Sequence, residues 1–448
     1  MISEYIKSLK GKKIAFIGVG VSNMPIIRAF SKAGLTLSVR DVKDTSKGDY
    51  GEELKNLGVE IISGEDYLKG INEDILFLSP AVRDDKKELL EAKARGAVLT
   101  SEMQEFFNLC PCKILAVTGS DGKTTTTTLI AKLLEAAGKR VHLGGNIGKN
   151  LFAELDSIAP EDFAVVELSS FQLMKLSVSP DVAVVTNVTP NHLDWHTGMD
   201  EYTAAKKNIF INQKEDALLV LGADNEVTEG MKSEAKGKVL LFGKNGGSQI
   251  KITDEGLWFE GKLILKDEDI LLVGAHNRLN YAAAFAAVHG FVSEGELLEV
   301  AKSFGGVEHR IERVRSLDGV TYYNSSIDSS PTRTAAALES FKDKVIVICG
   351  GYDKKIPLEP LGGLFLRKAK AAVLMGDTAD KIERVLKEVG FENPVLRADS
   401  MDEAVKLARS LAVEGDTVIL SPAAASFDKF KNFAQRGEIF KNCVLSLN

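Results

Sequence analysis

Short, continuous apolar segments alternate with longer helical segments along almost the whole chain. The short segments are rich in valine, isoleucine and leucine, which is typical of strands that are buried on both faces of a sheet. Alternation of such strands with helices predicts a parallel α/β architecture. Helices are expected at 124–137, 280–289 and 401–411. The expected strands are 13–17, 36–39, 75–78, 114–117, 164–167, 182–186, 218–221, 345–348, 372–375 and 417–420.

The pattern restarts twice, so we expect the 448 residues to form three domains. Residues 1–111 open with a strand and a Gly-rich turn and are expected to form a Rossmann-like domain. A new strand, Gly turn and helix begin at Lys113, which predicts a central P-loop ATPase-type domain over 112–306. A further α/β series predicts a Rossmann-like domain over 307–448. Within the central domain, the segment GLWFEGKLIL predicts a β-hairpin or a small antiparallel sheet.

Composition excludes several classes of protein. The chain has 63 acidic and 56 basic residues and a formal net charge of -7, so it lacks the basic field of a nucleic-acid binder. Its four cysteines do not make a disulfide framework, and the spacing of Cys110 and Cys112 is neither that of a zinc ribbon nor a redox CxxC. No signal peptide is recognisable, and no segment reaches the ~20 apolar residues of a membrane span. We therefore expect a cytoplasmic protein without nucleic-acid partners.

The segment AVTGSDGKTTTTTLI is the strongest single motif. Small residues between a strand and a helix let backbone N–H groups approach phosphate oxygens, and the helix N-terminus favours negative charge. Lys123 supplies a mobile cation for the β- and γ-phosphates, and the Thr124 hydroxyl is placed to bind Mg²⁺. Val117 stands where the longer Walker pattern needs glycine, so this is the shorter TGxxGKT variant. The predicted ATP-binding residues of this loop are Gly119, Ser120, Asp121, Gly122, Lys123, Thr124 and Thr125.

Polar residues follow the next strands of the central domain. Glu167 ends the strand FAVVE, where a carboxylate is well placed for a metal ion, although a helix cap or a salt bridge is an equal alternative. The loop TPNHLDWH brings His192 and His196 to the same edge, a weak indication of metal or phosphate chemistry. Asn277 is expected either to cap a helix or to contact ATP, and Arg310 either to reach phosphate or to lie on the surface.

The first domain contains an incomplete dinucleotide fingerprint. In KIAFIGVGVSNMPIIRAF the first two glycines, Gly18 and Gly20, are present, but Asn23 replaces the third. Ser22 or Asn23 is expected to cap the following helix, with Pro25 in its first turn. Binding of a diphosphate nucleotide is the better interpretation, and a nicotinamide oxidoreductase is the alternative.

Seven segments together resemble the Mur ligase family, in the order in which that family has them: TGSDGKTTT, ELSSFQL, NVTPNHLDWH, YTAAKKNIF, GAHNRLN, EHRIE and SPAAASFDKFKNFAQRG. The resemblance covers nearly the whole chain and is strongest to the member that adds D-glutamate to UDP-N-acetylmuramoyl-L-alanine in peptidoglycan precursor synthesis. It implies an ATP-dependent ligase that forms an amide through an acyl phosphate and releases ADP and phosphate. It also implies a monomer that uses two Mg²⁺ ions.

The resemblance assigns roles to residues of the central domain. It implies Lys123, His192 and Lys206 as catalytic residues, and Thr124, Glu167, His192 and Lys206 as the metal site. Lys206, in AAKKN, matches a lysine that the family carbamylates with CO₂, so that it carries negative charge near the second magnesium ion. The resemblance also implies ATP contacts at Asn277 and Arg310.

The two substrates are expected to bind outside the phosphate loop. The resemblance implies that the UDP-sugar lies against Gly20, Val21, Ser22, Asp41, Ser79 and Asn146. It implies that the incoming D-glutamate is held by Lys354, Ser426, Phe427 and Phe433.

The chain departs from the family pattern in the third domain. The family often has NDSKATN where this chain has NSSIDSSPT, so Ser325 replaces an aspartate and Ile327 a lysine. Asp328 could replace the missing acid by a small shift. Two alternatives therefore stay open: a Mur-type or folylpolyglutamate-type ligase for a different amino acid, and a nucleotide-sugar-binding regulator with a decayed catalytic centre.

Overall fold

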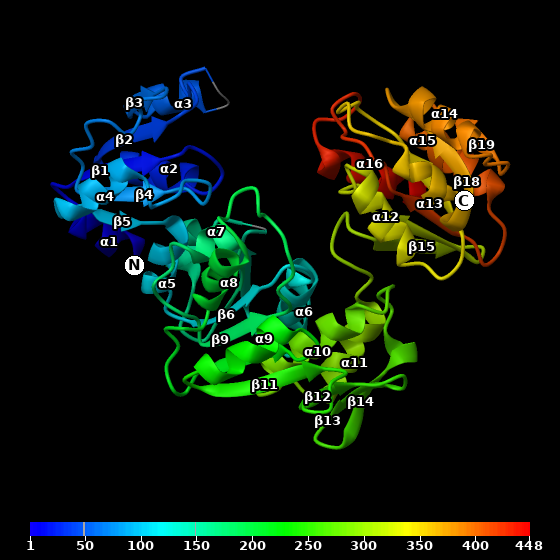
Figure 1. The fold of residues 1–448 in the computed structure, drawn as a ribbon, viewed down its shortest axis with the longest axis horizontal. Coiled ribbons are helices and arrows are strands. Elements are labelled where there is room, and N and C mark those ends of the chain that lie inside the picture. The colour runs from blue at the N-terminus through cyan, green and yellow to red at the C-terminus, as the bar shows by residue number, and fades with distance from the viewer. Residues whose placement is uncertain (48–49, 148) are drawn as a thin grey trace. The chain divides into compact units, whose positions relative to one another are not determined.

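The structure is a computed structural model that describes residues 1–47, 50–147 and 149–448. The chain forms two compact units, which we name the N-terminal unit (Met1–Asp267 with Arg278–Val300) and the C-terminal unit (Glu268–Asn277 with Ala301–Asn448). Figure 1 shows the first sheet in blue, the central sheet in cyan to green, and the third sheet in yellow to red. This α/β architecture with three sheets confirms the expected fold class. The domain boundaries at 111 and 306 stay a prediction, because the first two sheets share one compact unit.

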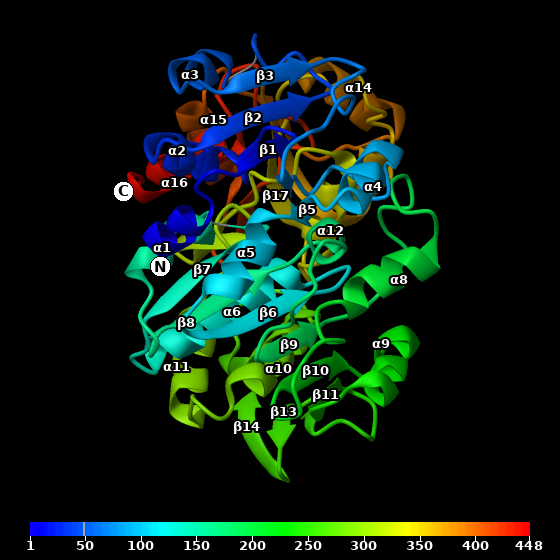
Figure 2. The same cartoon turned by 90° about the vertical axis from the view of Figure 1, so that its left-hand side faces the viewer.

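The first sheet is entirely parallel, with strand order β3-β2-β1-β4-β5. Figure 2 shows β3, β2 and β1 side by side in this order. Its strands are β1 (Lys13–Ile17), β2 (Thr36–Asp41), β3 (Glu60–Ser63), β4 (Ile75–Leu78) and β5 (Val98–Thr100). Its helices are α1 (Ile2–Ser8), α2 (Met24–Lys32), α3 (Gly51–Asn56), α4 (Lys87–Ala94) and α5 (Glu102–Leu109). The order reverses direction at β1, and ligands of such sheets bind at the carboxyl ends of strands at this point.

The central sheet has the order β14-β13-β12-β11-β10-β9-β6-β8-β7 and is parallel from β7 to β12. Its strands are β6 (Lys113–Thr118), β7 (Val141–Gly145), β8 (Phe163–Glu167), β9 (Val182–Val185), β10 (Leu218–Gly222), β11 (Lys238–Gly243), β12 (Ile250–Ile252), β13 (Gly256–Phe259) and β14 (Lys262–Lys266). Its helices are α6 (Lys123–Ala136), η1 (Leu151–Ser157), α7 (Ser170–Leu173), α8 (Met199–Lys207), α9 (Glu226–Gly230), η2 (Met231–Glu234), η3 (Asp267–Asp269), α10 (Asn277–Val288) and α11 (Glu294–Ser303).

The predicted hairpin is confirmed as β13 and β14, which pair antiparallel. Glu260 and Gly261 connect the two strands and have φ angles of 50° and 78°. Positive φ at both turn residues is the geometry of a type I′ turn, whose twist matches that of the strands.

The third sheet has the order β15-β16-β20-β17-β18-β19 and is parallel except for the pair β15–β16. Its strands are β15 (Glu312–Leu317), β16 (Val320–Asn324), β17 (Val345–Cys349), β18 (Ala369–Leu374), β19 (Val395–Arg397) and β20 (Thr417–Leu420). Its helices are α12 (Pro331–Glu339), α13 (Pro360–Lys368), α14 (Ala379–Glu388), α15 (Met401–Leu411) and α16 (Phe433–Leu445).

All ten expected strands and the three expected helices are present, and the continuous apolar runs are buried as expected. Strands that the sequence did not predict include β3, β5, β7 and β19, each of which lies at the edge of its sheet. An edge strand has one neighbour and more exposure, so it needs no continuous apolar run. None of the described helices is both long and apolar enough to cross a membrane.

The first two sheets are joined by a common apolar core. Phe30 of α2 lies 6.2 Å from Phe152 of η1 between ring centroids, and Tyr5 of α1 lies 6.0 Å from Phe152. Phe30 and Phe152 are both almost fully buried. Burial of large aromatic side chains contributes strongly to stability, so this core holds the two sheets together as one unit.

Candidate active site

The phosphate loop connects β6 to α6 in the central sheet. Gly119 and Gly122 have φ angles of 150° and 79°, a region that other residues rarely adopt. A Cβ atom at Gly119 would lie 1.8 Å from Thr186 Oγ1, and one at Gly122 would lie 2.5 Å from Asn280 Oδ1. Both glycines are therefore required for the path of the loop as well as for close approach of its N–H groups to a ligand.

The order of strands in the sheet explains why the candidate site residues meet at this loop. β6 lies between β8 and β9, so the carboxyl ends of three neighbouring strands open at one edge. The segment after β9 is bonded to the loop: Ser120 N donates to the Asn187 carbonyl at 2.9 Å, and Asp121 N to Asn187 Oδ1 at 3.0 Å. The Ser120 hydroxyl donates to the Thr189 carbonyl at 2.9 Å. The loop is thus held from the side of β9.

Lys123 begins α6 and folds back over the loop. Its Nζ donates to the carbonyls of Gly119 at 3.0 Å and Ser120 at 2.9 Å. Thr124 is half-buried, while Asp121 is exposed and Thr125 is buried. The ammonium group of Lys123 therefore lies within reach of the N-terminus of α6, where an anion is favoured.

Glu167 ends β8 beside the loop and is 1% exposed. Its Oε1 accepts from Asn146 Nδ2 at 2.7 Å, whereas its Oε2 is buried and has no hydrogen-bond partner among the described residues. A buried carboxylate oxygen without a partner is costly unless a ligand satisfies it, and carboxylate oxygens are preferred by Mg²⁺. The described residues contain no group of three or more His, Cys, Asp or Glu side chains arranged to hold a metal. Glu167 therefore fits a magnesium ion that takes its other ligands from hydroxyl groups, water or phosphate.

Lys206 of α8 is the most unusual cation of this edge, because its side chain is 1% exposed. Its Nζ donates to the Gly119 carbonyl at 2.7 Å and lies 4.5 Å from the centroid of the Tyr202 ring. Burial, together with the nearby charge of Lys123, lowers the pKa of Lys206 to about 7, against an opposite effect of Asp121. A large fraction of this amine is therefore uncharged at neutral pH.

The two histidines of the TPNHLDWH loop have different environments. His192 is exposed, has a φ angle of 55° and lies 5.0 Å from the Phe171 ring. His196 is buried, and its two ring nitrogens lie 2.9 Å from Ser170 Oγ and 3.1 Å from Glu201 Oε2. Burial also lowers the pKa of His196. His192 is thus accessible to a ligand, whereas His196 holds the loop.

Glu201 connects this loop to the first sheet. Arg83 donates to Glu201 Oε1 at 2.7 Å, and Thr197 N donates to Glu201 Oε2 at 2.9 Å. Arg83 is the main reason that the pKa of Glu201 falls to about 2. Because Glu201 belongs to α8, this network also fixes the helix that carries Lys206.

A hollow of about 250 Å³ lies near Glu167 within the N-terminal unit. Of the six residues predicted to bind the UDP-sugar, Val21, Ser22 and Asn146 line it. The hollow is also lined by Glu102 and Gln172, together with Pro80, Gly145, Ile147, Lys149 and Asn150. Asn150 Nδ2 donates to the Ser22 carbonyl at 2.9 Å, which joins the two sheets at its wall. The sequence reasoning did not single out Gln172, although it lies in the ELSSFQL motif, and it gave no role to Glu102.

The other three predicted UDP-sugar residues do not line this hollow. Gly18 has a φ of 85°, and a Cβ there would lie 2.4 Å from Ser79 Oγ, so Ser79 lies directly against the Gly-rich turn. Asp41 Oδ2 accepts from Val19 N at 2.8 Å, and Gly20 O accepts from Met24 N at 3.0 Å. These residues shape the turn between β1 and α2.

Asn23 stands at the N-cap position of α2, with Pro25 in the first turn, as predicted. The predicted cap at Asn23 is confirmed by its position, although within the described part of the chain its side chain bonds no N–H group of the helix. Its Nδ2 instead donates to the Gly18 carbonyl at 2.8 Å and closes the turn.

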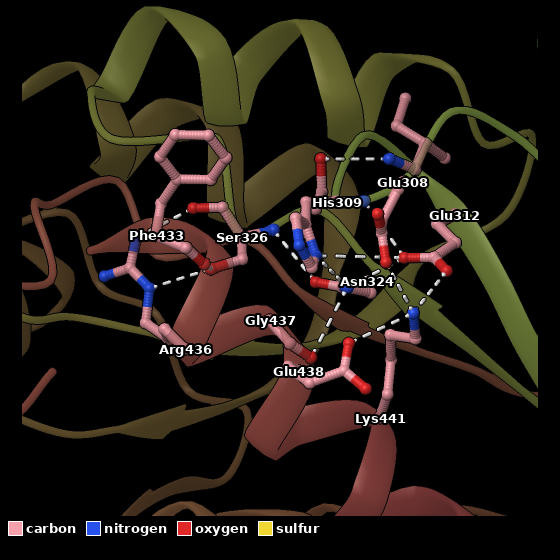
Figure 3. Close-up of polar contacts among 12 residues, drawn as sticks. Glu308, His309, Glu312, Asn324, Ser326, Phe433, Arg436, Gly437, Glu438 and Lys441 are labelled. Atoms are coloured by element: carbon pink, nitrogen blue, oxygen red, sulfur yellow. Dashed lines mark hydrogen bonds and ion pairs between the residues drawn. The ribbon is translucent and has the colours of Figure 1, made fainter. Parts of the chain in front are cut away.

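In the C-terminal unit, the segment before β15 is held by a polar network that Figure 3 shows. His309 Nδ1 lies 2.9 Å from Asn324 Nδ2, and Glu312 Oε2 accepts from Asn324 Nδ2 at 2.9 Å and from His309 N at 3.0 Å. Lys441 of α16 forms ion pairs with Glu308 and Glu312 at 2.9 Å and 3.1 Å. His309 is buried, whereas the adjacent Arg310 is exposed. The network therefore fixes the backbone of Arg310 and leaves its guanidinium group accessible.

Asn277 begins α10, and its Nδ2 donates to the Val273 carbonyl at 2.6 Å. The residue is 5% exposed. Its amide thus closes the turn that leads into the helix, and whether Asn277 caps α10 or contacts ATP stays a prediction.

Asp328 lies in the segment NSSIDSSPT, where the sequence departs from the family pattern and lacks the usual aspartate at Ser325. Its Oδ2 accepts from Ser421 Oγ at 2.8 Å, and the Ser325 hydroxyl also hydrogen-bonds its carboxyl group. Asp328 is 5% exposed, and burial raises its pKa to about 6 against the effects of Ser325, Ser421, Arg310 and Arg333. The carboxyl group of Asp328 therefore lies directly beside Ser325.

We expect Asp328→Asn to stabilise the protein at neutral pH but not in acid. The pKa of Asp328 is about 6 in the folded state and 3.8 in a model peptide, so the folded state binds more protons between these values. The free energy of unfolding of the wild type then falls as pH rises through this window, by up to about 3 kcal/mol. The asparagine variant does not titrate there. Urea unfolding of both proteins from pH 4 to pH 8 measures the difference, with Asp402→Asn, an exposed carboxylate of α15, as the control. A stability difference that does not change with pH would contradict the expectation.

The residues that are predicted to hold the incoming D-glutamate lie on two loops and one helix of the C-terminal unit. Tyr352, beside Lys354, pairs with Ala425, beside Ser426, through a backbone bond of 2.9 Å. Ser426 is buried, whereas Phe427 is 64% exposed and lies 6.2 Å from the Tyr352 ring. This places the loop of Lys354 next to the loop of Ser426 and Phe427.

Phe433 begins α16 and is 41% exposed. Its carbonyl accepts from Ser326 Oγ at 2.7 Å, and the same hydroxyl accepts from Nε of the buried Arg436 at 3.0 Å (Figure 3). Arg436 also donates to the carbonyls of Ala424 and Ala425 at 3.1 Å and 3.0 Å. Because it bonds both segments, Arg436 sets the position of Phe433 relative to the loop of Ser426.

Comparison with known proteins defines the class of this site. Residues 117–288 match the Mur ligase middle domain, and residues 309–424 match the glutamate ligase domain of Mur ligases. The chain therefore belongs to the Mur ligase family. Over 450 residues it is 46% identical to a UDP-N-acetylmuramoylalanine--D-glutamate ligase of Clostridium perfringens, covering 99% of this chain and 98% of that protein. It is 48% identical to the ligase of the same name from Acetivibrio thermocellus over 462 residues, covering 100% and 99% of the two chains.

Solved structures have the same fold at lower sequence identity. The UDP-N-acetylmuramate-alanine ligase of Thermotoga maritima superposes with a TM-score of 0.58 at 20% identity, covering 97% of this chain and 99% of that chain. A UDP-N-acetylmuramoyl-L-alanyl-D-glutamate--2,6-diaminopimelate ligase gives a TM-score of 0.57 at 18% identity, covering 91% and 86%. These likenesses support the fold and carry no statement about the substrate.

Proposed function

We propose that this Mur ligase joins D-glutamate to UDP-N-acetylmuramoyl-L-alanine at the expense of ATP, as a cytoplasmic monomer. The observation that carries the proposal is the similarity at 46% identity over 99% of the chain to ligases named for that reaction. The geometry at β6, β8 and β9 supports the ATP-dependent part, because a phosphate loop, an unpaired carboxylate oxygen and a buried lysine meet at one edge.

The reaction begins with transfer of a phosphoryl group. A carboxylate oxygen of the L-alanyl group attacks the γ-phosphorus of ATP, the bond to the bridging oxygen breaks, and ADP leaves. Lys123 and the N–H groups at the start of α6 are proposed to stabilise the charge on the transferred phosphoryl group. The nitrogen of D-glutamate then attacks the acyl carbon and loses a proton, and inorganic phosphate leaves.

Two magnesium ions would be held by Thr124, Glu167, His192 and Lys206. Bound Mg²⁺ supplies neutralisation of phosphate charge and orientation of phosphate oxygens. Two observations support this assignment: Glu167 Oε2 has no hydrogen-bond partner in the part of the chain that the structure describes, and His192 is exposed. Asn146 orients Glu167 by donating to its other oxygen.

Lys206 is proposed to act as a carbamate rather than as an ammonium ion. Only an uncharged amine reacts with CO₂, and the pKa of about 7 makes this form available at neutral pH. In the product one N–H bond is replaced by N–C and one proton is released. The carbamate would then supply an oxygen ligand for a second magnesium ion.

Residues of the C-terminal unit also have proposed ligand contacts. We propose that Asn277 and Arg310 contact ATP, and that Lys354, Ser426, Phe427 and Phe433 hold D-glutamate. The exposed guanidinium group of Arg310, fixed at its backbone by His309, supports the first proposal. The adjacent loops of Lys354 and Ser426 support the second.

Phosphate release with a panel of amino acids tests the proposed function. The protein is supplied with ATP, Mg²⁺ and UDP-N-acetylmuramoyl-L-alanine, and D-glutamate is compared with L-glutamate, L-lysine, meso-diaminopimelate and L-alanine. We expect turnover with D-glutamate alone. Turnover with another of these amino acids and not with D-glutamate would show a different ligase. Absence of turnover with every amino acid, together with retained binding of the nucleotide sugar, would favour a regulator.

A further inference from the structure

Glu102 is a buried acid with no role in the proposed reaction. It begins α5 directly after the N-cap residue Ser101 and is 6% exposed. One carboxylate oxygen is bonded to the backbone N–H of Phe152, whereas Oε1 is buried without a hydrogen-bond partner among the described residues. An orphaned oxygen of this kind needs a reason, because leaving a buried polar atom unsatisfied is costly.

Glu102 lies beside a hollow in which a ligand would satisfy this oxygen. Its side chain lines the hollow of about 250 Å³ that also contains Val21, Ser22, Asn146 and Gln172. The walls of this hollow come from the Gly-rich turn of the first sheet and from the segment beside Glu167 in the central sheet. A ligand in this hollow would therefore lie within reach of Glu102 and of the groups proposed to bind the nucleotide sugar.

The charged neighbours do not neutralise Glu102. Lys149 lines the same hollow, and Lys175 lines a smaller one with Glu102. Lys175 Nζ donates to the Pro80 carbonyl at 2.9 Å and to the Phe171 carbonyl at 3.3 Å, and burial lowers its pKa to about 8. Glu102 forms no ion pair with any residue in the described part of the chain, and burial raises its pKa to about 7. A nucleotide diphosphate adds negative charge, which favours the protonated acid further.

We propose that Glu102 is a specificity-determining residue that binds the nucleotide sugar as a neutral acid, donating a hydrogen bond from its carboxyl group to an acceptor oxygen of the ligand. This inference rests on the proposed function for the identity of the ligand. Glu102 would then favour ligands that have a hydrogen-bond acceptor opposite its carboxyl group. A ligand without this acceptor would leave the buried O–H donor of Glu102 unpaired, which is costly.

Proton uptake on binding tests the inference directly. UDP-N-acetylmuramoyl-L-alanine is titrated calorimetrically into the full-length protein at pH 8 in buffers of different ionisation enthalpy. The slope of the observed binding enthalpy against the ionisation enthalpy of the buffer gives the number of protons bound. At pH 8 most of Glu102 is ionised in the free protein, so we expect the wild type to take up close to one proton. We expect Glu102→Gln, whose amide already carries donor hydrogens, to bind without that uptake. Glu91→Gln, an exposed glutamate of α4, is the control and should behave as the wild type.

Kinetics give a second readout. Above pH 7 the KM of the wild type for the nucleotide sugar should increase with pH, with a slope that approaches tenfold per pH unit. The KM for ATP and kcat should not show this increase. Glu102→Gln should remove this pH dependence, and Glu102→Ala should raise the KM at all pH values.

The outcomes separate this inference from the proposed function. Wild-type binding without proton uptake at pH 8, or with proton release, overturns the role of Glu102 and leaves the proposed function standing. Equal uptake in the wild type and in Glu102→Gln also overturns it. Absence of any binding of the nucleotide sugar to the wild type overturns both.

Discussion

Replacement of Lys123 by alanine is expected to lower kcat by at least about 10²-fold, since a cation at transferring phosphoryl oxygens stabilises charge that is largest in the transition state. Lys123 Nζ contacts the carbonyls of Gly119 and Ser120, so it lies directly over the loop that would hold the phosphates. The half-buried side chain contributes little to the core, and the melting temperature should change little. Phosphate release with saturating D-glutamate and nucleotide sugar measures the loss.

The control for Lys123 lies on the same helix. Lys132 of α6 is exposed and forms an ion pair with Glu135 at 2.8 Å. Lys132→Ala should therefore retain wild-type turnover and affinity for ATP. A Lys123→Ala protein with more than about a tenth of wild-type kcat would show that the loop does not stabilise the transferred phosphoryl group in the proposed manner.

Replacement of Lys206 by alanine should have an effect of similar size, with activity regained on addition of a short-chain carboxylate such as acetate. The alanine variant leaves space beside the Gly119 carbonyl, and a small carboxylate can occupy it in place of the carbamate. The wild type should lose activity when bicarbonate and CO₂ are removed and regain it when they are restored. ¹³C-labelled bicarbonate should give a carbamate resonance in the wild type that is absent in Lys206→Ala.

The neighbouring Lys207 provides a matched control for these measurements. It is partly exposed and forms an ion pair with Glu234 at 2.5 Å. Lys207→Ala should retain activity and the carbamate resonance. Wild-type turnover in Lys206→Ala, or a wild-type enzyme insensitive to removal of CO₂, would refute a carbamate at this position. A loss of activity that acetate does not restore, in a variant that still melts as the wild type does, would also count against it.

The architecture was largely predictable because it depends on patterns that are local in sequence. Continuous apolar runs are required wherever a parallel strand is covered on both faces, so β1, β8 and β17 could be located without knowing their neighbours. Edge strands such as β3 and β19 were missed, because one open side removes that requirement. The phosphate loop was also predictable, since its strand, glycines, lysine and helix are consecutive.

The departure at NSSIDSSPT shows what a pattern cannot decide. From sequence, Ser325 and Ile327 left open whether the acidic group was lost, and a shifted Asp328 was one possibility. The structure places the Asp328 carboxyl group against the hydroxyls of Ser325 and Ser421, a contact between the segments that follow β16 and β20. That contact depends on the pairing of strands nearly a hundred residues apart, which no local motif encodes.

The class of fold, the loop that can hold phosphate and the family follow from residues that lie close together along the chain. The state of the groups around that loop depends instead on contacts between distant segments. Lys206 reads as an ordinary helical lysine, yet its burial against Gly119 and Tyr202 makes its amine readily uncharged. Glu102 is a first-turn acid in the sequence, yet packing against η1 leaves one of its oxygens without a partner among the described residues, beside a hollow. The physical reason is the same in both cases: protonation and hydrogen bonding depend on desolvation by neighbours that the fold brings from distant parts of the chain.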